Sequence, residues 1–421
     1  MIKHILTIVA LLTAIGADAQ TLKITNPTAL QRTDELVVLK RNFIENKTGK
    51  LQADQHIDIS KKDGSPVFVQ FDDLDKDGVW DELAFLYSFA PKEKAVFTIS
   101  TENLPLIKPV QREHVRQMRK NVDDTFGPQL LTDSVPAGQP NTDFSKVKLP
   151  DILTEGPAWE NDKVGFREYM DVRNIKDIWG KTTSKMMMDE VGVDPTNIYH
   201  HKAAWGMDIL AVGKSLGAGS LAILASQENG KDTLVRLGGK NMGPIYYEQL
   251  ADGLVRAVFT MHFPQWQALP GLPAIDLTEK ISIWGGQYFY QSEVSAINLP
   301  EKAKLISGIV NLKSEKANKI ASKNSKAIYS FAKQSENGDN LGLAIITKKD
   351  KGIDLDETPK TGDDDILSTY ILSVPFKTEH QAVFRFYAGW EASDEMFSSE
   401  TGFTSFLNKQ LTIFSCPLKI K

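Results

Sequence analysis

"GLVRAVFTMHF" (253–263) and "KISIWGGQYFY" (280–290) decide the fold class of this chain. Apolar residues recur at about every second position, which is the period of a half-buried β-strand. Turns containing Gly, Asn and Asp separate further segments of this kind, namely "PVFVQF" (66–71), "ELAFLYSF" (82–89), "KAVFTIS" (94–100), "GSLAILA" (219–225), "KLISGIVNL" (304–312), "LGLAIIT" (341–347), "STYILSVPF" (368–376) and "QAVFRFYAGW" (381–390). Helical patterns are confined to 113–118, part of 174–190 and 401–409. We therefore expect a mainly β fold, a large antiparallel β-sandwich with few short helices.

The composition is that of an ordinary globular protein, with 41% hydrophobic and 24% charged residues among 421. A formal net charge of −5 argues against a surface for nucleic acid or anionic membranes. Cys416 is the only cysteine, so no disulfide framework holds the loops. A bound metal ion is the first candidate for that task. The sequence indicates no organic cofactor and leaves the oligomeric state open.

The N-terminus, "MIKHILTIVALLTAIGADAQ" (1–20), has the features of a secretory signal peptide. A basic start precedes an apolar run from Ile5 to Ile15, and a small-x-small cleavage pattern follows before Gln20. This run is too short to span a bilayer, and no later segment is long and apolar enough to do so. We predict that residues 1–19 are removed and that the protein is exported, to the periplasm or the medium, without a membrane span.

A shift in composition suggests the domain organisation. The segment 121–158 is rich in Pro, Asp and Ser and lacks periodicity, so it is either a linker or a long loop bordering a cleft. We predict an N-terminal β region at 20–120 and a main β-sandwich domain at 159–421.

The segment "DDLDKDGVWDEL" (72–83) has the spacing of a calcium-binding loop. Its carboxylates alternate around Gly78, and calcium takes roughly six to eight oxygen ligands from such an arc. The glutamate that ends an EF-hand loop is replaced by Ala84, and the flanks are strand-like, so we expect a structural calcium hairpin and no sensor. The alternative is a solvated acidic turn. The expected ligands are Asp73, Asp75, Asp77, Asp81 and the carbonyl of Val79.

Polar and aromatic side chains concentrate in "EGPAWENDKVGFREYM" (155–170) and "IYHHKAAWGMDILAVGKSLGAGSLAI" (198–223). Aromatic rings offer flat faces to sugars, Arg and carboxylates bind carboxylates and hydroxyls, and His and Tyr exchange protons. Each residue also has a purely structural interpretation, such as a tryptophan in the core. Only one of the two adjacent histidines can face a given cleft if they lie on a strand. The candidates for substrate binding are Trp159, Glu160, Asn161, Asp162, His201, Trp205 and Asp208, and the candidates for catalysis are Tyr199, His200, Arg167 and Lys202.

Four segments resemble a secreted bacterial family that is labelled only as a domain of unknown function and is common in polysaccharide-utilisation loci. They are "PAWENDKVGFREYM" (157–170), the "IYHH" segment with "GMDILAVGKSLGAGSLA" (198–222), "DLDKDGVWDEL" (73–83), and "FRFYAGWEAS" with "FTSFL" (384–407). The resemblance implies a galactose-mutarotase-like β-sandwich. It also implies a dehydratase acting on uronic-acid-ended oligosaccharides, such as those from ulvan.

Such a dehydratase removes the C5 proton of a uronate and expels the 4-hydroxyl as water. A cation must neutralise the sugar carboxylate, and Arg167 and Lys202 are the candidates. His200 and Tyr199 are the candidates for the base and the acid, while the remaining residues would position the ring. The alternatives are a polysaccharide lyase using the same elimination, a sugar epimerase or mutarotase, and a glycan-binding protein without turnover.

Overall fold

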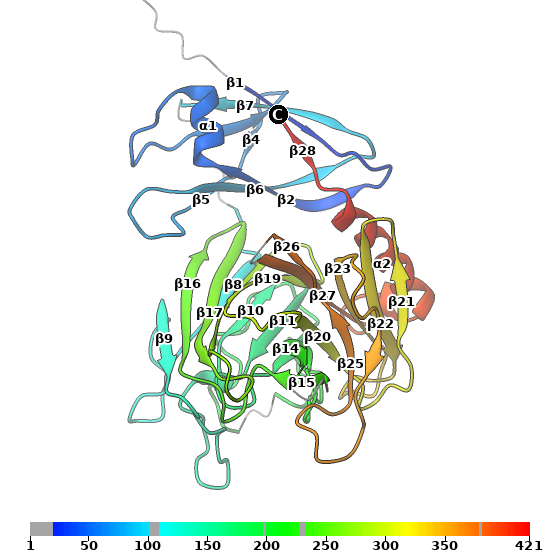
Figure 1. Cartoon of the computed structure of the whole chain (residues 1–421). Coiled ribbons are helices and arrows are strands. Elements are labelled where there is room, and N and C mark those ends of the chain that lie inside the picture. Colours follow the sequence, from blue (N-terminus) through cyan, green and yellow to red (C-terminus); the bar gives the residue numbers. More distant parts are fainter. Residues whose placement is uncertain (1–19, 102–108, 197–198, 227–231, 379–380) are drawn as a thin grey trace, which may run out of the picture.

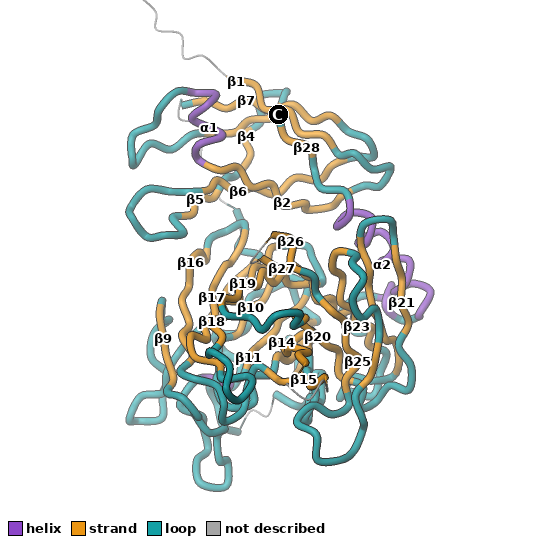
Figure 2. The backbone as a smooth tube through the Cα atoms, viewed as in Figure 1, coloured by secondary structure: helices purple, strands orange, loops and turns teal. Residues whose placement is uncertain are grey.

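The computed structural model describes residues 20–101, 109–196, 199–226, 232–378 and 381–421. The predicted signal peptide, 1–19, lies outside the described residues. The fold is mainly β and antiparallel, as predicted, with a smaller unit of two sheets beside a larger sandwich (Figure 1). Strands dominate both units, and helices are few (Figure 2). In the described part of the chain, no helix combines the length and apolar character needed to cross a membrane.

The smaller unit packs two antiparallel sheets around a core of its own. Leu22 and Phe97 from the first sheet meet Phe85 from the second in this core. The first sheet takes its edge strand from the C-terminus of the chain, with Ile24 opposite Ile420. The first sheet contains, in order, β28 (Lys419–Ile420), β1 (Gln20–Thr25), β7 (Lys94–Ser100), β3 (Asp58–Lys61) and β4 (Pro66–Val67). The second contains β2 (Arg32–Lys40), β6 (Glu82–Phe89) and β5 (Gln70–Asp72), and α1 (Arg41–Thr48) follows β2.

In the larger unit, two five-stranded sheets and one ten-stranded sheet share a single core. Each sheet contributes residues to that core, for example Phe166 and Ile223 from the two five-stranded sheets and Phe259 from the ten-stranded sheet. The first five-stranded sheet contains β13 (Gly206–Asp208), β12 (Lys176–Lys181), β11 (Val164–Glu168), β10 (Ala158–Asn161) and β8 (Glu113–Arg116). The second contains β15 (Asp232–Arg236), β14 (Ala218–Ser226), β20 (Lys304–Val310), β25 (Thr369–Ser373) and β24 (Asp356–Glu357). The ten-stranded sheet contains β21 (Asn318–Ala321), β22 (Ser325–Ala332), β23 (Leu341–Lys348), β27 (Gln381–Trp390), β19 (Phe289–Ile297), β18 (Ile275–Trp284), β17 (Arg256–Trp266), β16 (Ile245–Asp252) and β9 (Thr132–Val135), and β26 (Phe376–Thr378) pairs with β27.

One helix packs on the ten-stranded sheet. In α2 (Glu400–Ser415), Phe403 and Leu407 lie one turn apart and belong to the same buried cluster as Tyr387 of β27. This helix confirms the prediction for 401–409. The two other helical predictions are wrong, because 113–118 contains β8 and 174–190 contains β12. Every residue of β12 is buried, so its sequence lacks the alternation that identifies a half-buried strand.

Buried ion pairs join the two units. Arg256 on β17 donates from Nε to Asp72 Oδ2 on β5 (2.7 Å) and also pairs with Glu82 on β6. Removing one partner from a buried ion network leaves an uncompensated charge, which is strongly destabilising. These contacts therefore fix the smaller unit at the end of β17 in the larger one.

The limits of the two units differ from the predicted ones. β8 pairs with β10 in the larger sandwich, with Val115 opposite Trp159, so this unit begins before residue 121. Within 121–158, β9 pairs with β16, which makes this segment part of the sandwich. β28 belongs to the smaller unit because it pairs with β1. These pairings join residues that are far apart in the sequence, and composition alone does not reveal them.

Candidate active site

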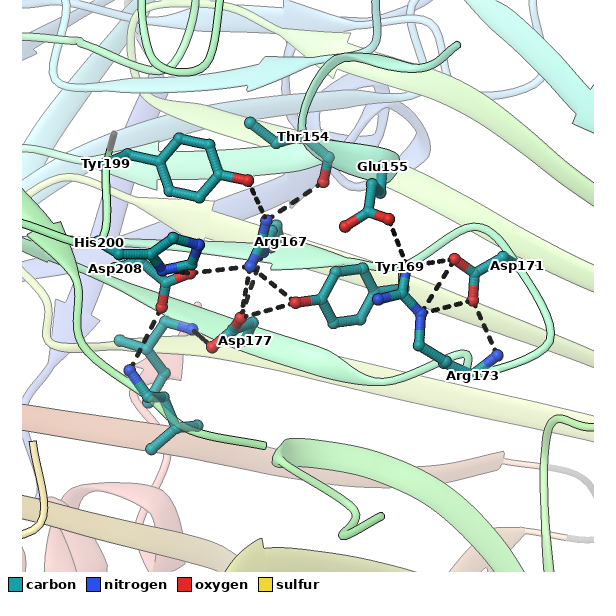
Figure 3. Close-up of polar contacts among 12 residues, drawn as sticks. Thr154, Glu155, Arg167, Tyr169, Asp171, Arg173, Asp177, Tyr199, His200 and Asp208 are labelled. Atoms are coloured by element: carbon teal, nitrogen blue, oxygen red, sulfur yellow. Dashed lines mark hydrogen bonds and ion pairs between the residues drawn. The ribbon is translucent and has the colours of Figure 1, made fainter. Parts of the chain in front are cut away.

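A buried arginine organises the candidate site. Arg167 on β11 stands opposite Asp177 on β12, and Asp208 ends the next strand, β13. Its Nε donates to Asp177 Oδ2 (3.2 Å), and its Nη2 donates to Oδ2 of both Asp177 and Asp208 (2.8 Å each). Nη2 also donates to the Tyr169 hydroxyl (2.7 Å). Adjacent strands thus place two carboxylates and a phenol around one guanidinium (Figure 3).

The other side of this guanidinium reaches Tyr199. Arg167 Nη1 donates to the Tyr199 hydroxyl and to the carbonyl of Thr154, at 3.4 Å in both cases. The Tyr199 ring packs edge-on against Trp179, with centroids 5.1 Å apart. The phenol oxygen is therefore held in place by a buried cation.

His200 stands beside Tyr199, with ring centroids 4.6 Å apart. Its Nδ1 lies 3.5 Å from Asp208 Oδ2, and 56% of its side chain is exposed. Partial burial and the charge of Arg167 lower the pKa of His200 from its ordinary value of 6.5, so the imidazole is neutral at pH 7. Burial and the neighbouring Asp177 raise the pKa of Asp208 well above its ordinary value. A neutral imidazole can accept a proton.

Tyr199 and His200 line a cavity of about 410 Å³, the His200 cavity. The segment predicted to be a linker or cleft-bordering loop supplies much of its wall. Phe144 in this segment exposes 52% of its surface. Lys148 has no carboxylate oxygen within 4.0 Å among the described residues. The remaining lining residues are Leu149, Pro150, Thr154, Gly192, Asp194 and Pro195.

Two of the four catalytic candidates, Arg167 and Lys202, do not line this cavity. Arg167 is 1% exposed, and its Nε, Nη1 and Nη2 groups are all occupied by protein acceptors. Lys202 points elsewhere, with Nζ 5.4 Å from the centre of the Trp390 ring. The expectation that Arg167 neutralises a sugar carboxylate is therefore wrong, whereas Lys202 is exposed but does not line the His200 cavity. Arg167 instead holds Tyr199 and Asp208 by hydrogen bonds, and Asp208 in turn lies beside His200.

Four of the predicted substrate contacts are parts of the folded structure. Trp159 is fully buried in the core, and Glu160 pairs with Lys181 below the surface. Asn161 is buried and donates to two backbone carbonyls, one at the end of β18 and one in the turn between β18 and β19. Asp162 accepts from Arg112 Nη2 (2.9 Å). Because these groups already have protein partners or no path to solvent, the prediction that they bind substrate is wrong.

The other three residues predicted to bind substrate differ in where they lie. His201 is exposed and does not line the His200 cavity. Trp205 is half-buried and packs on Trp179, with centroids 5.9 Å apart. Only Asp208 belongs to the cluster, through Arg167 and His200.

Several residues of this site are not predicted by the sequence. Asp177 lies in the segment 174–190, where a helix is expected, and Tyr169 has no predicted role. Phe144, Lys148 and Thr154 lie in the aperiodic segment, for which one of the two interpretations was a loop bordering a cleft. That interpretation was the only signal available for them, because no spacing rule connects this segment to 199–208.

The acidic loop forms a second cluster of possible ligands. Asp73, Asp75 and Asp81 each contribute one carboxylate oxygen to this cluster, and these three oxygens lie within 4.8 Å of one another. Asp73 Oδ2 accepts from Gly78 N (2.9 Å), while Asp73 Oδ1 is shielded from solvent and has no hydrogen-bond partner among the described residues. Asp77 lies outside this group of three and accepts from the backbone of the turn instead. Hard oxygen donors around an unpaired buried oxygen fit a calcium ion.

Comparisons with known proteins place the chain in a family. No curated protein matches the sequence. Solved structures that are similar include a glycosyl hydrolase family 38 protein from Enterococcus faecalis, with 9% identity, and an alpha-mannosidase from Enterococcus faecalis V583, with 10% identity. Each has a TM-score of 0.45 and is matched over 96% of this chain, which spans 47% and 46% of their lengths. The family described as a domain of unknown function, DUF4861, matches residues 24–420, and the chain therefore belongs to the DUF4861 family.

Proposed function

We propose that this protein is an exported carbohydrate-active enzyme, a dehydratase that eliminates water from the uronic-acid end of an oligosaccharide. The observation that carries the proposal is the pairing of Tyr199 and His200 on one wall of the His200 cavity. A hydroxyl donor and a neutral imidazole are the acid and base that a β-elimination requires.

His200 is the proposed base. Its Nδ1 faces Asp208, which leaves Nε2 on the opposite edge of the ring to take the C5 proton of the uronate. The lowered pKa of His200 keeps the imidazole neutral and ready to accept that proton near pH 7. The C5–H electrons form the C4=C5 double bond as the bond from C4 to its hydroxyl oxygen breaks.

Tyr199 is the proposed acid. Its hydroxyl gives a proton to the departing 4-hydroxyl, which leaves as water. The Nη1 group of Arg167, which donates to the same oxygen, stabilises the phenolate that remains. Transfer of the proton from His200 to Tyr199 through solvent restores the starting state.

Lys148 takes the part that was expected of Arg167 or Lys202. Proton abstraction adds charge to the sugar carboxylate, so a nearby cation lowers the barrier. Lys148 is an exposed cation on the cavity wall without a carboxylate partner among the described residues. Phe144, on the same wall, offers an apolar face against which a sugar ring can stack.

The test is to mix the protein with oligosaccharides that end in a uronic acid. We expect ultraviolet absorbance from a 4,5-unsaturated sugar and the loss of one water in mass. His200→Ala and Tyr199→Phe should abolish the product, while His201→Ala, the matched control, should retain it. A product of unchanged mass would point to an epimerase or mutarotase. Cleavage of the sugar chain would point to a polysaccharide lyase. Binding that survives both substitutions, with no product formed, would point to a glycan-binding protein. Any of these results contradicts the dehydratase.

Calcium binding at the acidic loop is a second part of the proposal. Asp73, Asp75 and Asp81 would hold the ion, and the carbonyl of Val79 and the side chain of Asp77 were predicted to complete the set. The ion would hold the turn between β5 and β6 and would take no part in the reaction. Isothermal titration with calcium tests this directly, and Asp73→Asn should abolish the heat of binding.

A further inference from the structure

A second cavity, of about 280 Å³, lies against the same segment that borders the His200 cavity. We name it the Glu155 cavity. Its lining residues are Gln139, Pro140, Asn141, Thr142, Asp143, Lys146, Val147, Asp151, Ile152, Glu155, Met170 and Asp171. The proposed reaction uses none of them.

The two cavities share a wall. Lys146 and Val147 line the Glu155 cavity, and the next two residues, Lys148 and Leu149, line the His200 cavity. Likewise, Thr154 lines the His200 cavity, and the next residue, Glu155, lines the Glu155 cavity. A ligand longer than one sugar could therefore reach from one cavity to the other across this wall.

The end of this wall is a rigid turn. Thr154 and Glu155 both have positive φ (51° and 68°), a conformation that costs energy in residues other than glycine. Buried Arg116 holds the turn by donating to the carbonyl of Leu153 (2.6 Å) and to Oγ1 of Thr154 (3.0 Å). The strained turn places two consecutive residues at the walls of two different cavities.

The arginine clusters at the bases of the cavities are also in contact. The Tyr169 ring lies between Arg167 and Arg173, with Cζ atoms 4.6 and 3.7 Å from its centroid. Arg173 Nη2 donates to Glu155 Oε1 (2.7 Å), so the Glu155 carboxylate is fixed (Figure 3). Glu155 Oε2 has no donor among the described residues, and it is available to a ligand hydroxyl.

The lining chemistry selects the class of ligand. Carboxylates outnumber cations on this wall, which disfavours an anion. A metal ion is also disfavoured, because the only group of three converging ligands in the described residues is the one in the acidic loop. Amides, a hydroxyl and fixed carboxylates beside Val147, Ile152 and Met170 suit a hydroxyl-rich, uncharged ring with an apolar face.

We propose that the Glu155 cavity binds the neutral sugar that follows the uronic acid in the substrate. This inference rests on the proposed function and extends it. The substrate is then an oligosaccharide whose acidic ring lies in the His200 cavity and whose next, uncharged ring lies beyond the shared wall.

The test fills the cavity. Val147 is 40% exposed, so Val147→Trp adds bulk in the cavity without disturbing the core. The probes are glucuronic acid and a disaccharide of glucuronic acid linked to a neutral sugar. The quantity compared is kcat/KM for the disaccharide divided by kcat/KM for the monosaccharide. We expect this ratio to be about tenfold lower in Val147→Trp than in the wild type, because the variant loses one or two hydrogen bonds to the second sugar. Val122→Trp, at a fully exposed position in the same segment, is the matched control and should keep the wild-type ratio.

An unchanged ratio in Val147→Trp overturns the second subsite. If the wild type turns over neither probe, the proposed function fails, and binding then decides the subsite alone. Calorimetric titration with a neutral disaccharide should show binding to wild type and to Val122→Trp, with loss in Val147→Trp. Equal binding by all three proteins, or no binding by any, would rule the subsite out.

Discussion

Arg167 donates a hydrogen bond to the hydroxyl of Tyr199 over 3.4 Å, and it does so from a buried position with two carboxylates at its other side. The guanidinium thus connects the buried interior of the sandwich to a side chain that lines a cavity. Its effects on stability and on activity can be separated by substitution.

Arg167→Met should unfold the protein more easily, because it leaves Asp177 and Asp208 buried without their cation. Loss of one partner of such a network typically lowers the free energy of unfolding by about 3–5 kcal/mol. Arg167→Lys keeps a charge but loses the fork that reaches both Tyr199 and the carboxylates. It should lose about 100-fold in kcat with a smaller loss of stability. Urea denaturation and steady-state kinetics measure both effects, and a fully active Arg167→Lys would contradict the positioning role.

On the acidic side of the pH profile, the activity should persist below pH 6.5. A base works only when deprotonated, and the pKa of His200 is lowered by partial burial and by Arg167, so the acidic limb of kcat/KM lies below the ordinary histidine value. Glu336 acts in the opposite sense, raising the pKa of His200 through its negative charge. Glu336→Gln should therefore move this limb to still lower pH. Proton NMR titration of His200 provides an independent check, and a midpoint above 6.5 would contradict the assignment.

Arg256→Met should weaken the attachment of the smaller unit. Asp72 and Glu82 would remain buried at the interface without a cation, at a cost of about 3–5 kcal/mol. We expect scanning calorimetry to show two separate transitions where the wild type has one. Arg119→Met, which removes a partly exposed partner of Asp133, is the control and should cost at most about 1 kcal/mol. A single transition at the wild-type temperature would contradict the docking role.

Calcium should stabilise the protein without taking part in the reaction. A ligand present at 100 times its Kd stabilises a folded protein by about 2.7 kcal/mol, so chelation should lower the Tm. The kcat at a temperature well below the Tm should stay the same. Asp73→Asn should remove the response to calcium, whereas Asp63→Asn, in an exposed turn of the same unit, should retain it. Loss of kcat on chelation at low temperature would contradict a purely structural ion.

The fold was predictable where one face of a strand is buried and the other is not. β17 alternates in burial near its centre and β18 in its first six residues, and their sequences show it. β12 is buried throughout, so its periodicity is lost and a helix was expected there. The short helix α1 was missed because its eight residues bury only Ile44 and give little apolar pattern.

The site was predictable only in part, for a related reason. Tyr199 and His200 stand out because they are adjacent and chemically distinctive. Trp159, Glu160 and Asn161 are equally distinctive in sequence, yet β10 lies between β11 and β8 and buries them all. Lys148 carries no local signal, since its position on the cavity wall follows from the path of a long loop.

The pairing of β1 with β28 also affects how the chain folds during synthesis. The smaller unit contains the first described strand, yet its sheet is complete only when the last strand arrives. The entire larger sandwich is made in between, and long-range pairing of this kind is slow and leaves strand edges open to aggregation. Until then the edge of β1 that β28 will cover is unpaired, and an unpaired strand edge can pair with a strand of another chain.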